Sequence, residues 1–388
     1  MELDLTDPEF FRDPYPVYRG MREHGPLFRS ANGPWVAIGF REVSTLLKSD
    51  RVSADFSAES HWQARRGDAG ALGGRWLLFN EGDSHRTLRR IMSRRFMPGA
   101  IAERRGKVAN LIDSTLRSLP SDTVIDFIGD VAEPVVTTLV RDTLGLPADQ
   151  DHNLTRWSAA IIRMSDPLTS TSVRGELRRA VGEFRAFVDE AWRAGQLHPD
   201  GLAADLLSAD SGLDHPDGVA NIVMLLMAGL DTTVGQLGCA LMALTPHPDQ
   251  FTVLRDDPDP AKVGELLRYD SPVHIVTRRI LTDIDCPAGT LRAGQKLMLL
   301  LAAANRDPNR YPDPDRLWLN RPGVEQLAFG AGTHYCLGSH LARLTVFTLL
   351  ARMARRYTRV RLVDTDLSWR PSVVARRLDR LPVRLETR

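Results

Sequence analysis

The stretch Phe329-Gly330-Ala331-Gly332-Thr333-His334-Tyr335-Cys336-Leu337-Gly338 leads directly into an apolar segment with helical periodicity, residues 338–356. Glycine adopts backbone conformations that other residues avoid, so the early glycines predict a tight turn, and Gly338 permits a flat partner to approach closely. Backbone N–H donors and a helix N-terminus stabilise a thiolate, and this loop offers both to Cys336. The stretch therefore predicts a ligating cysteine at the start of a helix. A buried free thiol is the plainer alternative.

Other chemistries for the glycine-rich segments fail on spacing. A zinc site built from His334, Cys336 and His340 lacks a fourth ligand at a usual distance in the sequence. A dinucleotide-binding loop needs a third glycine where Tyr335 stands, and a phosphate-binding loop at residues 289–294 has Gln295 in place of its lysine. Both nucleotide-binding interpretations are excluded.

Composition limits the classes of partner. The 388 residues are 43% hydrophobic and 26% charged, with a formal net charge of +1, which does not indicate binding to nucleic acid or to a membrane surface. Three cysteines cannot form a disulfide framework and fit a reducing compartment. The longest apolar runs are far shorter than the ~20 residues of a membrane span, and the acidic N-terminus is unlike a signal peptide. We expect a cytoplasmic protein that binds neither nucleic acid nor membrane.

Helical periodicity dominates the chain. It is clearest at residues 101–119, at 218–243, where the segment is apolar nearly all round, and at 338–356. Strand signals are fewer and lie towards the two ends of the chain, at residues 35–38, 275–281, 296–301 and 383–386. The predicted fold is mainly α with small β-sheets.

The pattern Phe-Gly-x-Gly-x-His-x-Cys-x-Gly closely resembles the haem-ligand loop of the cytochrome P450 family, the haem-thiolate monooxygenases. The resemblance implies the cytochrome P450 fold, with haem b (iron protoporphyrin IX) between a long central helix and the cysteine loop. It makes Cys336 the axial ligand of the haem iron. Phe329, Gly330, Gly338 and Ala228 then contact the cofactor. Because the likeness runs over residues 7–385, it predicts a single domain, residues 1–388, whose β-rich part comes from both ends and whose α-rich body lies between.

A second motif is Glu265-Leu-Leu-Arg268, whose spacing puts a carboxylate and a guanidinium on one helical face. Alone, such pairs usually lie on the solvated surface. The resemblance implies instead the family's buried structural pair, joined by an arginine from the loop before the cysteine. Arg316 is the first candidate for that arginine and Arg321 the second.

A third motif is Ala228-Gly229-Leu230-Asp231-Thr232-Thr233, in the middle of the long apolar segment. Glycine, Asp and Thr weaken or divert helical hydrogen bonds, so we expect a local distortion of the helix. The plainer alternative is a kinked buried helix whose polar groups are satisfied. The resemblance assigns Thr232 and Asp231 to oxygen activation and proton relay, with Ala228 and Gly229 leaving room for O2.

A fourth motif is His85-x-x-x-Arg89, which places two cations on one helical face among further arginines. A solvated basic face is an equally ordinary interpretation. The resemblance assigns His85 and Arg89 to the haem propionates, together with His334 and Arg279, because charge-assisted hydrogen bonds to carboxylates need fixed cations. Arg278 is the alternative to Arg279.

The resemblance also implies partners. It leaves no room for a flavin module, and three cysteines are too few to ligate an iron–sulfur cluster through four thiolates. The resemblance therefore implies electrons from a separate ferredoxin and its ferredoxin reductase. The arginine-rich residues 86–105 are the expected docking site for that acidic partner. The co-substrates are O2 and a small molecule.

The substrate side is the least defined part of the sequence. By position, the expected pocket residues are Met224, Met227, Ile275, Thr277 and Val374, with Val373 beside them and a substrate loop that contains Trp62, Trp76 and Phe79. Each of these is, taken singly, more ordinary as a core residue. The apolar lining predicts a mid-sized, mostly apolar substrate from specialised metabolism. Oxidative coupling, cyclisation or desaturation at the same site is an alternative, and a non-catalytic haem-binding protein is a lesser one.

Overall fold

The computed structural model describes residues 7–31, 33–56, 72–120, 123–165, 171–372 and 374–387. Helices make up most of this part of the chain. The longer helices are α3 (Phe40–Leu47), α5 (Gly82–Ser93), α6 (Pro98–Ser118), α7 (Glu133–Leu144), α8 (Asp151–Ile161), α9 (Thr171–Arg193), α11 (His215–Leu244), α12 (Pro248–Asp256) and α15 (Ser339–Arg356). Shorter helices are α1 (Pro8–Arg12), α2 (Tyr15–Met21), α10 (Leu202–Leu207), α13 (Val263–Tyr269) and α14 (Leu301–Ala304).

The residues fall into two compact units. The first unit consists of Met1–Ser53, Arg105–Ala132 and Thr232–Arg388, and the second of Ala54–Arg104 and Glu133–Asp231. The prediction of a single domain stays a prediction.

The first unit contains the β-structure. Its strands are β1 (Leu27–Arg29), β2 (Trp35–Ala37), β3 (Val52–Ser53), β4 (Val124–Asp126), β5 (Ile275–Ile280), β6 (Ile284–Cys286), β7 (Gly289–Leu291), β8 (Lys296–Leu300), β9 (Arg359–Leu362) and β10 (Pro382–Glu386). A five-stranded sheet has the order β1-β2-β8-β5-β3, in which only β2 and β8 are parallel. A three-stranded sheet has the order β4-β10-β9, and β6 pairs with β7. The predicted mainly α fold with small sheets is confirmed.

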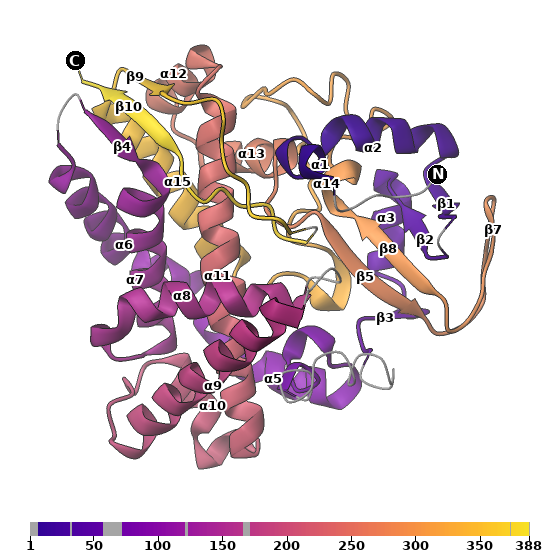
Figure 1. The fold of residues 1–388 in the computed structure, drawn as a ribbon, viewed down its shortest axis with the longest axis horizontal. Helices are drawn as coiled ribbons and strands as arrows, with labels where there is room; N and C mark the ends of the chain where they lie inside the picture. The colour runs from indigo at the N-terminus through magenta and orange to yellow at the C-terminus, as the bar shows by residue number, and fades with distance from the viewer. Residues whose placement is uncertain are drawn as a thin grey trace. The chain divides into compact units, whose positions relative to one another are not determined.

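Two apolar clusters cover the five-stranded sheet. The sheet and the helices α2 and α3 beside it are drawn in Figure 1. On one face, Leu47 of α3 packs with Leu297 and Leu299 of β8. On the other face, Tyr18 of α2 packs with Leu300 of β8. Successive residues of a strand point in opposite directions, so Leu299 and Leu300 are both buried but on opposite faces of the sheet.

The longest helix is α11, and it confirms the helix predicted at residues 218–243. No break interrupts it between His215 and Leu244, so the expected local distortion around Asp231 and Thr232 is not found as an interruption. It is the one described helix long and apolar enough to cross a membrane, but 78% of its most apolar window is buried inside the protein. Burial all round explains why it lacks a polar face.

The second unit is helical in its described part. Phe184 of α9 packs against Trp157 of α8 with ring centroids 5.4 Å apart, and Val188 continues the same buried face of α9. A bidentate ion pair joins Arg95 to Asp205 of α10, with bond lengths of 2.7 and 2.9 Å. The ion pair holds the turn between α5 and α6 beside α10.

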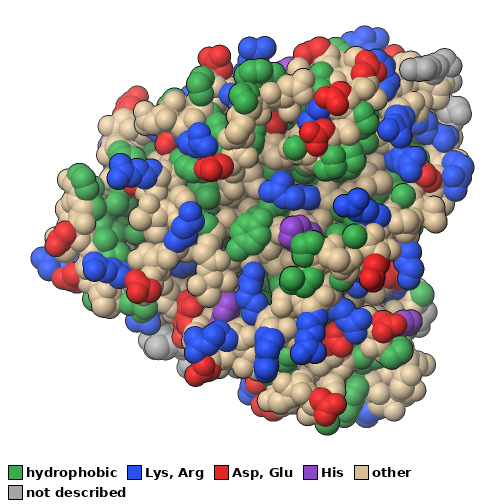
Figure 2. Space-filling model, turned by 180° about the vertical axis from the view of Figure 1, so that it is seen from behind, with side chains coloured by type: hydrophobic (Ala, Val, Ile, Leu, Met, Phe, Trp, Pro, Cys, Tyr) green, Lys and Arg blue, Asp and Glu red, His purple; other side chains and the backbone are tan. Residues whose placement is uncertain are grey.

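Charged side chains of both signs are interspersed over the face shown in Figure 2, with groups of Lys and Arg among them. This pattern agrees with a net charge of +1.

Candidate functional site

The cysteine loop, residues 327–338, is a tight turn closed by its own backbone. Gly330 N–H donates to Leu327 O (2.8 Å), and Cys336 N–H donates to Phe329 O (2.9 Å). Gly330 and Gly332 have φ values of +68° and +70°, which favour glycine. A Cβ at Gly332 would lie 2.6 Å from the carbonyl oxygen of Leu47, so no larger residue fits there. The predicted turn is therefore present.

Cys336 lies three residues before Ser339, the first residue of α15. Its side chain is half-buried, and the partial positive charge of the helix N-terminus favours a thiolate at this place. Phe329 of the loop contacts the same helix, because the guanidinium of Arg343 in α15 lies 5.0 Å from the Phe329 ring centroid. The loop thus holds a partly accessible sulfur at the start of a helix.

The other two cysteines have different surroundings. Cys239 is fully buried in α11, and burial raises the pKa of its thiol well above the usual value. Cys286 lies in the β6–β7 hairpin, where its sulfur is 3.0 Å from Gly289 O. Cys336 is therefore the cysteine with the best surroundings for a thiolate ligand.

The alternation along β5 distinguishes the two candidate arginines. Ile275, Thr277 and Arg279 share one face of the strand, and Arg278 points to the other face, where it is buried and donates to Thr277 O (2.8 Å). Nε of Arg279 is buried and has no hydrogen-bond partner within the described residues. A bound ligand can satisfy such a donor, so Arg279 is the arginine of the two that offers a buried donor to a ligand.

The cysteine loop and the end of β5 belong to one apolar cluster, which contains Ala331 and Ile280. His334 lies in the same loop and is half-buried. Three predicted site residues, Arg279, His334 and Cys336, belong to the first unit.

The remaining predicted cations lie in the second unit. His85 and Arg89 are on one face of α5, four residues apart; His85 is buried and Arg89 half-buried. A solvated basic face does not describe them, because the exposed arginines of α5 are Arg86 and Arg90 instead. Arg86 pairs with Asp83.

The predicted residues of α11 lie on one helical face by their spacing of three and four: Met224, Met227, Ala228, Asp231 and Thr232. Both methionines and Asp231 are buried. Ala228, by contrast, is exposed, and Thr232 is half-buried, although most of the helix around them is buried. Solvent thus reaches α11 at Ala228 and Thr232, two of the residues predicted to lie beside O2.

Val374 and Ile275, two of the predicted substrate-side residues, lie close together although 99 positions separate them in the sequence. Val374 O accepts a hydrogen bond from His274 N (3.0 Å), and Val374 packs against the apolar cluster that contains Ile275. Thr277 lies on the same face of β5 as Ile275. Trp62 and Val373 lie outside the described residues. Trp76 is buried and stacks on Phe79, with centroids 6.0 Å apart.

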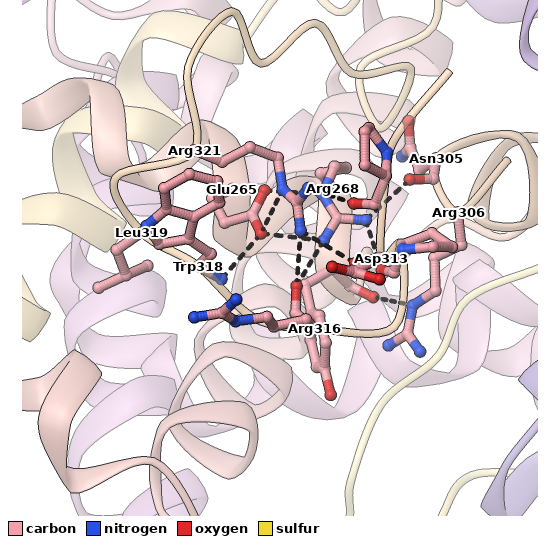
Figure 3. A network of polar contacts seen from close by, with 12 residues as sticks. Glu265, Arg268, Asn305, Arg306, Asp313, Arg316, Trp318, Leu319 and Arg321 are labelled. Atoms are coloured by element: carbon pink, nitrogen blue, oxygen red, sulfur yellow. Dashed lines mark hydrogen bonds and ion pairs between the residues drawn. The ribbon is translucent and has the colours of Figure 1, made fainter. Parts of the chain in front are cut away.

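The Glu265–Arg268 pair is fully buried and bidentate. Arg268 donates from Nε and Nη2 to the two carboxylate oxygens, at 2.7 and 2.9 Å (Figure 3). Its Nη1 and Nη2 also donate to the carbonyl oxygens of Asn305, Pro314 and Arg316. The pair predicted from Glu265-Leu-Leu-Arg268 is therefore a core contact and no solvated surface pair.

The choice of Arg316 as the arginine that joins this pair was wrong. Arg321, the second candidate, donates from Nε to Oε1 of Glu265 over 3.2 Å. Arg316 contributes only its carbonyl oxygen, and its guanidinium lies over the ring of Trp318 (Figure 3). The chain turns between Arg316 and Arg321 and places the Arg321 side chain, 6% exposed, beside Glu265. The path of the chain therefore determines which arginine contacts the buried pair.

Sequence reasoning missed Asn305, which positions the cysteine loop. Its Oδ1 accepts a hydrogen bond from Leu327 N (2.7 Å), and its carbonyl oxygen accepts one from Arg268. Asn305 is completely buried and follows the apolar helix α14. A polar residue directly after a buried apolar run was the signal that could have found it.

Comparisons with known proteins agree with this geometry. Residues 260–368 match the family model described as "Cytochrome P450". The chain is 30% identical over 398 residues to vitamin D(3) 25-hydroxylase of Pseudonocardia autotrophica, covering 99% of this chain and 97% of that protein. It is 26% identical to the polyketide biosynthesis cytochrome P450 PksS of Bacillus subtilis (strain 168), covering 97% of both chains. The crystal structure of CalO2 superposes with a TM-score of 0.91 at 31% identity, covering 100% of this chain and 99% of that one.

The relatives define a class of oxidoreductases, the haem-thiolate monooxygenases, and the site has the cysteine that this class requires. The chain belongs to the cytochrome P450 family. The predicted family and fold are confirmed.

The residues of the first unit fit a haem. One accessible sulfur at the start of α15 suits an axial thiolate. Nε of Arg279, which has no partner among the residues that the structure describes, suits an anionic carboxylate. By contrast, no three His, Cys, Asp or Glu side chains gather around a possible ion in the described part of the chain. The donors therefore fit a metal carried by a macrocycle better than an ion held by side chains alone.

Proposed function

We propose that this cytochrome P450 holds haem b through Cys336 and inserts one oxygen atom of O2 into a C–H bond of a small, mostly apolar molecule. The observation that carries the proposal is the half-buried sulfur of Cys336 at the start of α15, in a loop whose shape requires glycine at 332. The haem, when bound, supplies the oxidation chemistry, and the protein supplies its ligand, orientation and proton path.

The chain's cations hold the propionates of the cofactor. Arg279 offers a buried Nε without a partner in the described chain, and His334 lies in the cysteine loop. On α5, His85 and Arg89 share one face. Charge-assisted hydrogen bonds from such fixed donors are about twice as strong as neutral ones. Phe329, Gly330, Gly338 and Ala228 contact the macrocycle.

Asp231 and Thr232 deliver protons. Asp231 is buried in α11, and Thr232 next to it is half-buried. The carboxylate of Asp231 passes a proton inward, and the hydroxyl of Thr232 holds it beside O2, so that water rather than peroxide leaves. The accessible Ala228 one turn earlier keeps space for O2.

The substrate is apolar and comes from specialised metabolism. The residues that we assign to the substrate side are mostly apolar: Met224, Met227, Ile275, Thr277 and Val374. The relative named for polyketide biosynthesis supports this substrate class. We place the enzyme in the cytoplasm, in keeping with the burial of α11.

Electrons come from a ferredoxin, itself reduced by a ferredoxin reductase. Arg90 and Arg94 are exposed near the end of α5, and neither guanidinium forms an ion pair within the described residues. Met97, beside them, is 56% exposed. Exposed cations around an apolar side chain fit an acidic electron donor.

The test is the absorption spectrum of the reduced protein with carbon monoxide. The wild-type protein is expected to give the red-shifted Soret band of thiolate ligation. Cys336→Ala is expected to lose the band, and Cys286→Ala, in the β6–β7 hairpin, is expected to keep it. A wild-type protein without the band, or a band that survives Cys336→Ala, overturns the proposal.

A further inference from the structure

A buried polar cluster in the first unit has no role in the site described so far. Its centre is Asp270, at the end of α13, and Arg376, in the C-terminal segment; both are more than nine-tenths buried. Nε of Arg376 donates to Oδ2 of Asp270 over 3.3 Å, and Tyr15 donates its hydroxyl to Oδ1 over 2.8 Å. Burial opposes the charge on Asp270, but the Arg376 guanidinium and its other neighbours hold the pKa of Asp270 well below the usual value.

Arg376 extends this contact to the N-terminal helices. Its terminal nitrogens donate to the carbonyl oxygens of Phe11 and Arg12, at 2.6 and 2.9 Å. Its guanidinium stacks on the ring of Trp369 at 3.4 Å. Each of the three guanidinium nitrogens thus donates a hydrogen bond inside the protein, which holds the side chain in one orientation.

The two residues of the ion pair lie in or next to two segments, residues 272–274 and 374–376, that pair with each other. Arg376 N–H donates to Pro272 O (2.6 Å), and His274 N–H donates to Val374 O (3.0 Å). Val273 and Ala375 between them form an antiparallel β-bridge. Residues 374–376 therefore run as a short added strand beside residues 272–274. These segments carry Val374 and lead into Ile275.

Helix α11 packs against these two paired segments. A Cβ at Gly235 would lie 2.7 Å from Arg376 O and 3.2 Å from the Pro272 side chain, so only glycine allows this approach. Gln236 donates from Nε2 to Asp270 O over 3.3 Å. Gly235 and Gln236 are three and four residues after Thr232, on the same face of the helix.

From these contacts we propose that the Asp270–Arg376 ion pair is a positioning device. It holds the turn of α11 that carries Thr232, the start of β5 and residues 374–376 in one register, and so sets the size of substrate that fits beside Ile275 and Val374. The proposal rests on the proposed function. A buried ion pair gives little net stability compared with an apolar pair, so a role in fixing one arrangement explains its presence better.

The test compares two azole probes on the haem-loaded protein. Imidazole ligates the iron without reaching the walls of a pocket, whereas 4-phenylimidazole must also fit its ring between them. One methylene of misfit in an apolar pocket is worth about tenfold or more in discrimination. Asp270→Asn and Arg376→Gln are therefore expected to change the dissociation constant of 4-phenylimidazole by at least about fivefold and that of imidazole by less than about twofold.

Two variants sharpen the comparison. Asp270→Glu keeps the charge and is expected to restore part of the wild-type ratio of the two constants. Asp366→Asn is the matched control, because the Arg12–Asp366 pair joins the same terminal segments at the surface, with exposed fractions of 52% and 87%. It is expected to leave both constants unchanged.

The outcomes separate the two proposals. Equal changes for both probes, or a loss of thermal stability with an unchanged ratio, overturn the positioning role. If Asp270→Asn does not fold, Tyr15→Phe, which removes one hydrogen bond to Asp270, decides by the same ratio. A wild-type protein that shows no azole spectrum overturns the proposed function, and this role with it.

Discussion

Arg321 donates from Nε to Oε1 of Glu265 over 3.2 Å, although 56 positions separate the two residues in the sequence. Its terminal nitrogens donate to the carbonyl oxygens of Pro312, Asp313 and Arg316. One guanidinium thereby closes the turn at residues 312–321 onto the core carboxylate that also binds Arg268. The chain that leads towards the cysteine loop is fixed by this contact.

We expect Arg321→Ala to lower the free energy of unfolding by about 2–3 kcal/mol, because it removes hydrogen bonds to a buried charge and leaves carbonyl oxygens unpaired. Arg316→Ala is the control, since the side chain of Arg316 only covers Trp318. Its effect is expected to stay within about 0.5 kcal/mol. Urea unfolding measures both; a larger loss for Arg316→Ala would contradict the assignment.

The sequence predicts those helices and strands whose hydrophobic periodicity is strong over a long segment. Long periodic segments at α6, α11 and α15, and the four strands with strong β signals, are present within a residue or a few of their expected bounds. Strand β3 (Val52–Ser53) has only two residues, too few for a sequence pattern, and is defined by its pairing with β5. The same limit applies to Arg321 and to the Asp270–Arg376 pair, which depend on the path of the chain between distant residues.

Haem retention distinguishes Arg279 from Arg278. Arg279→Gln is expected to speed the transfer of haem to apomyoglobin by about tenfold or more, because it removes a charge-assisted hydrogen bond to a propionate. Arg278→Gln removes a side chain that donates to Thr277 O on the other face of β5, and is expected to change the rate by less than about twofold. Faster loss from Arg278→Gln than from Arg279→Gln would reverse the assignment.

Proton delivery at Thr232 is measurable as coupling. Thr232→Ala is expected to raise the hydrogen peroxide formed per electron consumed at least about threefold, because general acid–base catalysis of this kind contributes large factors. A surrogate ferredoxin and reductase supply the electrons, with any compound that the wild-type protein converts. Thr233→Ala is the control, since one residue along a helix points about 100° away. Unchanged coupling in Thr232→Ala would remove its proposed role.

The buried His274 makes stability depend on pH. Burial lowers the pKa of His274, so the folded state keeps it neutral, with Nδ1 2.9 Å from the Tyr18 hydroxyl. Below about pH 6.5 the unfolded chain binds a proton that the folded chain does not, and the free energy of unfolding falls as pH decreases. The contribution is fully present above that pH and declines by at most about 1.4 kcal/mol per pH unit below it.

His274→Asn is expected to flatten the part of the stability profile between about pH 6.5 and pH 5. Denaturant unfolding at several pH values measures the profile. His24→Asn serves as the control, because His24 is exposed. If the two variants and the wild-type protein lose stability in parallel over this range, His274 is not the group that titrates.

Arg90 and Arg94 are the sharpest test of the electron-donor surface. Replacing both with Glu reverses two exposed charges near the end of α5, and we expect the rate of reduction by ferredoxin to fall about tenfold at about 20 mM salt. The difference from the wild-type protein should shrink at about 300 mM salt, because exposed charges are then screened over a few ångströms. Arg178→Glu with Arg185→Glu, on the exposed face of α9, makes the same change of net charge elsewhere. Should this control slow the reduction as much, net charge rather than a docking surface on α5 governs the encounter.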